Sequence, residues 1–155
     1  MGRVALTTVI EAPVERVFMA WTSDHAMPRW FPDVQEIYDV TGPLDQPGSR
    51  YKLRFKTGPR YSCQVVAVEP NQRHDHRFEP IGLMRFSGFA TMTFEPQGDQ
   101  TLFSFDARYD LPLGPVGRLL DWLLLARIAE KRMAAEVPAF KAFVEAEAQN
   151  TVSID

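Results

Sequence analysis

The sequence predicts an α+β domain in which seven antiparallel strands, with two short helices after the first strand, precede one long C-terminal helix. Between residues 34 and 110, apolar and polar residues alternate with a period of two in short segments separated by turn residues, which is typical of an antiparallel meander. From about residue 114 to residue 148 the apolar period lengthens to that of a helix. The chain has 155 residues and no internal repeat or long linker, so we expect one domain over residues 1–155.

The N-terminal part predicts one strand followed by two short helices. Residues 4–10 are rich in β-branched side chains and favour a strand. Four apolar residues then recur at helical spacing after a proline, which predicts a helix over residues 13–23. Two further prolines bracket a single helical turn that carries Trp30 and Phe31. This large apolar pair must pack against the domain or bind something.

Six more strands are expected after this turn. The clearest alternation lies in residues 50–56, where Tyr51, Leu53 and Phe55 share one face and basic residues occupy the other. The remaining strands are predicted over residues 34–41, 61–69, 73–79, 85–95 and 101–110.

The long helix carries two apolar stripes. The core stripe, which we expect to face the sheet, consists of Leu119, Trp122, Leu123, Ala126, Met133, Val137, Phe140 and Val144. The leucine stripe, Leu120, Leu124 and Ile128, lies on the far side of the first half of the helix only. It needs a partner: a lid made by the Trp30 turn and the loop at residues 111–117, a second subunit, or a membrane surface. Pro138 is expected to kink the helix near Ala134.

Composition excludes several classes of function. The net charge is -3 and no basic run is present, so we expect no nucleic-acid partner. The single cysteine, Cys63, allows neither an internal disulfide nor a thiolate zinc cluster, and we expect it to be a small core thiol. No window approaches the roughly 18 apolar residues of a membrane span, so we expect no stable membrane insertion and a cytoplasmic protein.

The chain resembles the START-like superfamily, also called SRPBCC, over nearly its whole length. The segments that carry the resemblance are IEAPVERVFMAWTS, PGSRYKLRF, VVAVEPNQR and DLPLGPVGRLLDWLLLARIAEKRM. The last of these is similar to the entry into the C-terminal helix in the polyketide cyclase/dehydrase-like branch. The resemblance implies a helix-grip fold, in which a curved sheet wraps the long helix around a cavity that opens near the helix's N-terminal half. The superfamily shares no catalytic motif.

Inward-facing aromatic residues are numerous for a small domain, and they form either a solid core or the wall of a cavity. We favour a cavity, because one helix against a strongly curved sheet leaves space at its wide end. Small residues at Gly88 and Ala90 leave room beside Phe86 and Met92. The expected ligand-binding residues are Trp30, Phe31, Tyr51, Leu53, Phe55, Phe78, Phe86, Met92, Phe103, Phe105, Tyr109, Leu119, Leu120, Leu123 and Arg127.

The candidate catalytic residues are polar groups expected on inward faces. His74 and His76 share a strand face with Phe78, where they could act as a general acid and base or as metal ligands. Alternatively, the strand has the opposite register, or the imidazoles are partly exposed near its end. Spacing offers no third ligand, so we expect no metal and no cofactor.

A second candidate cluster lies on the long helix. Glu130 falls on the predicted core stripe with Arg127 beside it, and the pair is either an acid or base with an anion anchor or a solvated salt bridge at the cavity mouth. Tyr109 could orient a ligand through its hydroxyl or cap the core.

Three functions remain open on the sequence alone. The first is binding or transport of a hydrophobic small molecule such as a lipid, isoprenoid or polyketide-like compound. The second is an enzyme of the cyclase/aromatase type, with the five polar residues above as candidates. The third is a partner-binding or chaperone-linked domain. We expect a monomer or a homodimer.

Overall fold

The computed structural model describes residues 2–82, 87–110 and 120–152; within the last range it describes the side chains of residues 124, 127, 128 and 130–151. Its elements are β1 (Gly2–Ile10), α1 (Val14–Trp21), α2 (Met27–Trp30), β2 (Val34–Tyr38), β3 (Arg50–Phe55), β4 (Arg60–Glu69), β5 (Arg73–Ile81), β6 (Ser87–Gln97), β7 (Gln100–Asp110) and α3 (Leu120–Val152).

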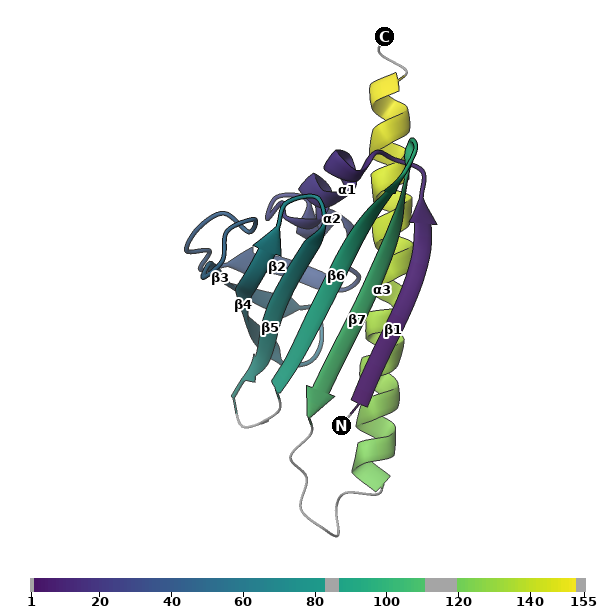
Figure 1. Ribbon diagram of the computed structural model, residues 1–155. Helices are drawn as coiled ribbons and strands as arrows, with labels where there is room; N and C mark the ends of the chain where they lie inside the picture. Colours follow the sequence, from purple (N-terminus) through teal and green to yellow (C-terminus); the bar gives the residue numbers. More distant parts are fainter. Residues whose placement is uncertain (1, 83–86, 111–119, 153–155) are drawn as a thin grey trace.

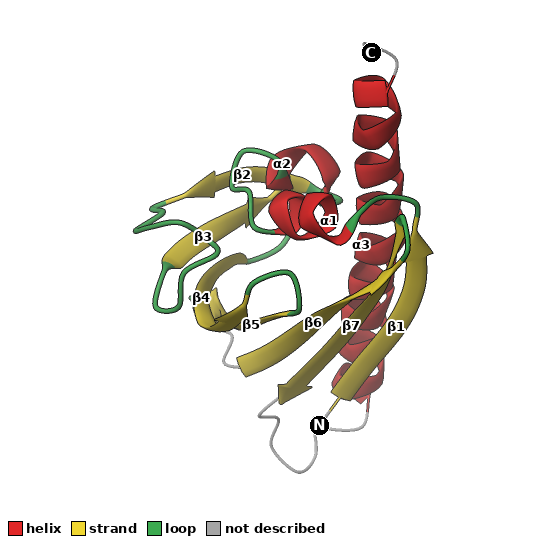
Figure 2. Ribbon diagram, turned by 45° about the horizontal axis from the view of Figure 1, so that its top comes forward, coloured by secondary structure: helices red, strands yellow, loops and turns green. Residues whose placement is uncertain are grey.

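The seven strands form one antiparallel sheet in the order β1-β7-β6-β5-β4-β3-β2. All strands from β2 to β7 pair with their sequence neighbours, and β1 joins the far edge beside β7. The sheet bends around α3, and α1 and α2 close one end of it (Figure 1, Figure 2). The predicted fold class, a helix-grip arrangement with seven strands, is confirmed.

Helix α3 runs from Leu120 to Val152, four residues beyond the predicted end. It continues through Pro138 as one helix, with the exposed proline on the solvent side, so the missing backbone bond does not break it. In its second half Val137, Phe140 and Val144 are buried, as the core stripe predicts. Leu119 and the side chains of Trp122, Leu123 and Ala126 lie outside the described part of the chain.

Aromatic packing joins α1, α2 and α3 into one core. Trp30 lies 4.8 Å from Phe140 and 5.1 Å from Trp21 between ring centroids. The Trp30 turn therefore packs against the C-terminal half of α3. It does not cover the leucine stripe, whose described members Leu124 and Ile128 are 63% and 53% exposed, so the lid expectation is wrong for this turn. The loop at residues 111–117 lies outside the described residues.

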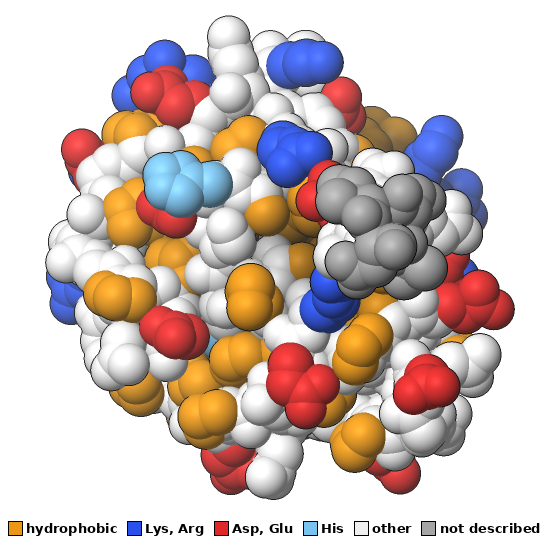
Figure 3. All heavy atoms as spheres, turned by 90° about the horizontal axis from the view of Figure 1, so that it is seen from above, with side chains coloured by type: hydrophobic (Ala, Val, Ile, Leu, Met, Phe, Trp, Pro, Cys, Tyr) orange, Lys and Arg blue, Asp and Glu red, His pale blue; other side chains and the backbone are white. Residues whose placement is uncertain are grey.

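The surface shows no single dominant charge on the face seen from above. Acidic, basic and hydrophobic side chains are interspersed there (Figure 3). Within the part of the chain that the structure describes, no helix is long and apolar enough to cross a membrane.

Candidate functional site

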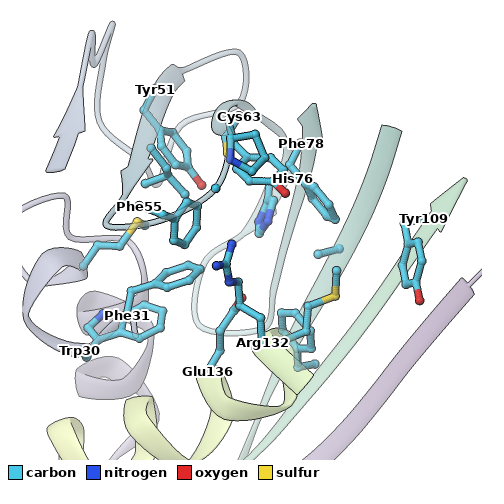
Figure 4. Close-up of a pocket in the computed structure, with 18 of the residues that line it drawn as sticks. Trp30, Phe31, Tyr51, Phe55, Cys63, His76, Phe78, Tyr109, Arg132 and Glu136 are labelled. Carbon is cyan, nitrogen blue, oxygen red and sulfur yellow. The ribbon is translucent and has the colours of Figure 1, made fainter. Parts of the chain in front are cut away.

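A cavity of about 230 Å³ lies between the concave face of the sheet and α3 (Figure 4). Nine of its twenty described lining residues are aromatic. The strand period places them: Tyr51, Leu53 and Phe55 are buried at alternate positions of β3 while the residues between them are more exposed. The cavity wall is therefore the inner face of the antiparallel strands. The described side chains of α3 leave the space in front of this face unfilled.

Most of the expected ligand-binding residues that the structure describes line this cavity. They are Trp30, Phe31, Tyr51, Leu53, Phe55, Phe78, Phe105 and Tyr109. Met92 and Phe103 are instead fully buried in the packed core beneath it. Phe86, Leu119 and the side chains of Leu120 and Leu123 lie outside the described residues.

Gly88 shapes one wall of the cavity. It pairs directly with Phe78 across β5 and β6, and a Cβ atom at this position would collide with the Phe78 ring. The glycine thus allows the ring to lie across β6. Ala90, two residues further, lines the cavity directly. The sequence predicts space beside both small residues. The Phe78 ring occupies that space at Gly88, whereas Ala90 borders the open cavity.

Both histidines of β5 lie on the concave side, but only His76 lines the cavity. His74 is 2% exposed, and its Nε2 atom donates a 2.8 Å hydrogen bond to the Leu44 carbonyl, which ties the loop before β3 to the sheet. The Nδ1 atom of His76 is buried and has no hydrogen-bond partner among the described residues. Burial lowers the pKa of His76 to about 3, with a smaller effect from His74, so the imidazole is neutral at physiological pH.

Glu136 supplies a carboxyl group to the apolar wall from α3. The residue is only 8% exposed, and burial raises its pKa to about 8, although Arg132 one turn earlier acts in the opposite direction. At neutral pH this side chain is a neutral carboxylic acid, which can donate a hydrogen bond.

Tyr51 and Cys63 form a polar pair on neighbouring strands β3 and β4. They are direct cross-strand partners, and the Tyr51 hydroxyl donates a hydrogen bond to the thiol. Burial raises the pKa of Cys63 to about 12 despite this bond, and it raises the pKa of Tyr51 well above its ordinary value. Cys63 is therefore a buried thiol, as expected, and it also lines the cavity.

Arg132 extends from α3 across the cavity toward Phe55 (Figure 4). Its guanidinium lies 4.8 Å from the centroid of that ring and donates a 3.4 Å hydrogen bond to the Thr57 carbonyl. The cation thus bridges the helix and the β3–β4 turn. Ile128, one turn earlier, also lines the cavity while being 53% exposed, so the cavity reaches the surface beside it. The expectation that the leucine stripe lies on the far side of the helix is therefore wrong for Ile128.

Comparison with known proteins places the chain in a family. The sequence profile described as polyketide cyclase / dehydrase and lipid transport matches residues 1–145. The chain belongs to this family. No curated protein matches its sequence.

Solved structures similar to this polyketide cyclase/dehydrase and lipid transport family member share its fold at low identity. The Zhui aromatase/cyclase from Streptomyces sp. R1128 has a TM-score of 0.75 at 12% identity, with 92% of this chain and 93% of that chain covered. Protein CV1439 from Chromobacterium violaceum has a TM-score of 0.72 at 17% identity, with 93% and 97% covered. TTHA0849 from Thermus thermophilus has a TM-score of 0.73 at 18% identity, with 94% and 98% covered. These likenesses show the fold alone.

Two polar residues expected at the site of this family member lie elsewhere. Glu130 is exposed, so its assignment to the core stripe is wrong, and it accepts a 3.3 Å hydrogen bond from the Tyr109 hydroxyl. Arg127 is also exposed and is absent from the described wall of the cavity. The described cavity side of α3 is formed by Met133 and by Ile128, Arg132 and Glu136, which are spaced by four residues.

Tyr109 lines the cavity on β7, several strands away from β3, next to the exposed Glu130. Burial and Glu130 both raise the pKa of its hydroxyl, which keeps the phenol protonated. The five candidate catalytic residues therefore do not form one cluster: His76 and Tyr109 face the cavity, His74 is buried behind it, and the other two are exposed. Within the described ranges, no three His, Cys, Asp or Glu side chains gather as metal ligands.

Sequence reasoning missed Arg132 and Glu136. The signal was present, because Glu136 is three residues after Met133 and four before Phe140, both assigned to the core stripe. A carboxylate at that spacing on an otherwise apolar face indicates a buried acid.

Proposed function

We propose that the protein binds a hydrophobic small molecule in the cavity between the sheet and α3. One observation carries the proposal: an aromatic-lined space of about 230 Å³ remains inside a domain whose neighbouring core, at Phe103, Phe140 and Met92, is fully buried. Protein interiors are normally packed without such voids. An engineered apolar cavity of about 150 Å³ binds benzene, so this one has room for a molecule of about two fused rings.

The composition of the wall supports an apolar ligand over a polar one. Aromatic rings supply most of the contact area and favour flat or unsaturated molecules through stacking and edge contacts. Among the polar groups that face the cavity, His76 and Glu136 are both uncharged at neutral pH. Arg132 is the charged group of the described wall, and it is already engaged with Thr57 and Phe55. A charged ligand would lose its hydration in this cavity without a free partner of opposite charge in the described wall, whereas an uncharged ligand loses little hydration free energy.

The experiment is titration of the protein with 1-naphthylamine, an environment-sensitive dye of two fused rings that is neutral at the pH of the assay. We expect saturable binding with one site, and we expect Phe105→Asp to abolish it because a carboxylate in the cavity opposes apolar burial. Thr93→Asp on the exposed face of β6 is the matched control and is expected to bind as the wild type does. Ala90→Leu fills the cavity without adding charge and covers the case in which Phe105→Asp fails to fold. Unchanged binding by folded Ala90→Leu and Phe105→Asp proteins would count against the cavity.

A second candidate function is an enzyme that acts on the bound molecule, as a cyclase or aromatase does. The specific observation is the pair of neutral polar groups, one imidazole from β5 and one carboxylic acid from α3, in a largely apolar cavity. The neutral carboxylic acid, with a pKa of about 8, can deliver a proton to a developing oxyanion, and the neutral imidazole can orient the substrate through a hydrogen bond. Mass spectrometry of molecules extracted from the purified protein distinguishes the two functions, because an intact lipid supports carriage and a cyclised product supports catalysis.

A further inference from the structure

We infer that Glu136 determines ligand specificity, by donating a hydrogen bond from its neutral carboxyl group to an acceptor oxygen, such as a ketone carbonyl, on an uncharged apolar ligand. The inference deepens the proposed function and rests on it.

The geometry at Glu136 leaves its carboxyl group without a protein partner. The side chain is 8% exposed, lines the cavity and shows no hydrogen bond or ion pair to any residue in the described part of the chain. Arg132, one helical turn away, donates instead to the Thr57 carbonyl. The carboxyl group borders the cavity, so a ligand that fills the cavity displaces water from it and leaves it unpaired unless the ligand supplies a partner. A polar atom on the ligand is the partner that this position lacks.

The surroundings decide that the carboxyl group acts as a donor. The titratable groups that share the cavity wall with it are Arg132 on α3, Tyr51 on β3, Tyr61 and Cys63 on β4, His76 on β5 and Tyr109 on β7. Burial keeps the tyrosines and the cysteine protonated and the histidine neutral at pH 7, so the single cation among these described groups is Arg132. The cation lowers the pKa of Glu136, but burial outweighs it and raises that pKa to about 8. The protonated carboxyl then presents one O–H donor to the cavity.

An uncharged acceptor oxygen fits this donor better than the alternatives do. A hydrocarbon would leave the carboxyl group unpaired after displacing any water, which is unfavourable for a buried polar group. A carboxylate ligand would bring a negative charge into an aromatic cavity and lose its own hydration there. A site built to hydrogen-bond a ligand discriminates against the analogue that lacks the bonding atom.

The test compares two probes that differ in one group. 2-Acetylnaphthalene and 2-ethylnaphthalene share two fused rings and a two-carbon substituent, but only the first carries a carbonyl oxygen. Their affinities are measured by displacement of 1-naphthylamine from the wild type, Glu136→Gln and Glu136→Leu at pH 6.5 and pH 9.5. These values of pH bracket the pKa of about 8, while Cys63, with a pKa of about 12, stays protonated in the folded protein.

We expect the wild type to bind the ketone about five- to tenfold more tightly than the hydrocarbon at pH 6.5, the ratio that one net hydrogen bond provides. At pH 9.5 the ionised carboxyl no longer donates, and the ratio falls to about one. Glu136→Gln keeps an N–H donor at both values of pH and is expected to keep the preference at both. Glu136→Leu is expected to bind the two probes equally.

The other outcomes contradict either the inference or the proposed function. Equal binding of both probes by the wild type at pH 6.5 overturns the inference and leaves the proposed function intact. Failure of both probes and the dye to bind overturns the proposed function itself. A ketone preference that persists in Glu136→Leu but disappears in His76→Phe assigns the hydrogen bond to the histidine and also overturns the inference.

Discussion

Replacement of Glu136 by glutamine should change how the stability of the protein depends on pH. The carboxyl group has a pKa of about 8 in the folded protein and 4.5 in its unperturbed state. Between these values the folded protein retains a proton that the unfolded chain has released. Stability is therefore highest below pH 4.5, falls as the pH rises toward 8, and is constant above it, as far as this group is concerned.

The size of this effect follows from the two pKa values. Each pH unit within the window costs about 1.4 kcal/mol, and the slope flattens as the folded protein also loses its proton near pH 8. Between pH 6.5 and pH 8.5 the loss amounts to about 2 kcal/mol. His74 and His76 have lowered pKa values, so stability also falls toward low pH as the unfolded chain gains their protons around and below pH 6.5. This contribution is the same in the wild type and in Glu136→Gln, so the difference between the two proteins isolates the glutamate.

The assay is urea denaturation of the wild type and Glu136→Gln at pH 6.5, 7.5 and 8.5. Glutamine does not titrate. We therefore expect the free energy of unfolding of Glu136→Gln minus that of the wild type to rise by about 2 kcal/mol from pH 6.5 to pH 8.5. Glu95→Gln, the same substitution at an exposed position of β6, serves as the control and should show no such trend. A difference between Glu136→Gln and wild type that stays constant within about 0.5 kcal/mol would refute the reasoning, because it would mean that the folded protein ionises this group normally.

Three further predictions concern residues around the cavity. His74→Ala should cost about 1–3 kcal/mol of stability in urea denaturation at pH 7.5, because a buried hydrogen bond to the loop before β3 is lost; a cost under about 0.5 kcal/mol would contradict that anchor. Gly88→Ala should weaken dye binding several-fold, since the added methyl group displaces the Phe78 ring toward the cavity, and unchanged affinity would contradict the packing described. The double change Leu124→Gln and Ile128→Gln should alter stability by less than about 0.5 kcal/mol because both side chains are exposed, and light scattering on the same protein shows whether this stripe joins two subunits.

The fold was predictable because local and long-range signals agree in the meander. In β3, the alternation of Tyr51, Leu53 and Phe55 with basic residues fixes which side faces the helix, and a shift by one residue would expose all three. In the second half of α3, Val137, Phe140 and Val144 form the apolar face that covers the sheet. At each of these positions the sequence pattern indicates one buried face.

The site was only partly predictable, because a cavity wall and a packed core follow different rules. The apolar pattern identified most of the aromatic residues in the cavity wall, but it also assigned Met92 and Phe103 to that wall. Periodicity predicts which face of a strand a residue lies on. It does not predict whether a neighbouring side chain fills the space in front of that residue. The same reasoning placed Glu130 inward and overlooked Glu136. Helical spacing alone does not fix which side of α3 borders the cavity: the described wall contains Ile128, Arg132 and Glu136, a row of residues that the core stripe did not include.

The central claim is that a small apolar molecule binds inside the sheet, next to α3. Nuclear Overhauser effects between bound 2-acetylnaphthalene and protein methyl groups test it most directly, because they arise only at short range. We predict contacts from the naphthalene protons to the methyl groups of Met27, Ala90 and Met133, which line the cavity. We predict none to Met19 or Val66, which are 67% and 40% exposed outside it. Saturable binding with contacts confined to the exposed methyl groups would contradict the account.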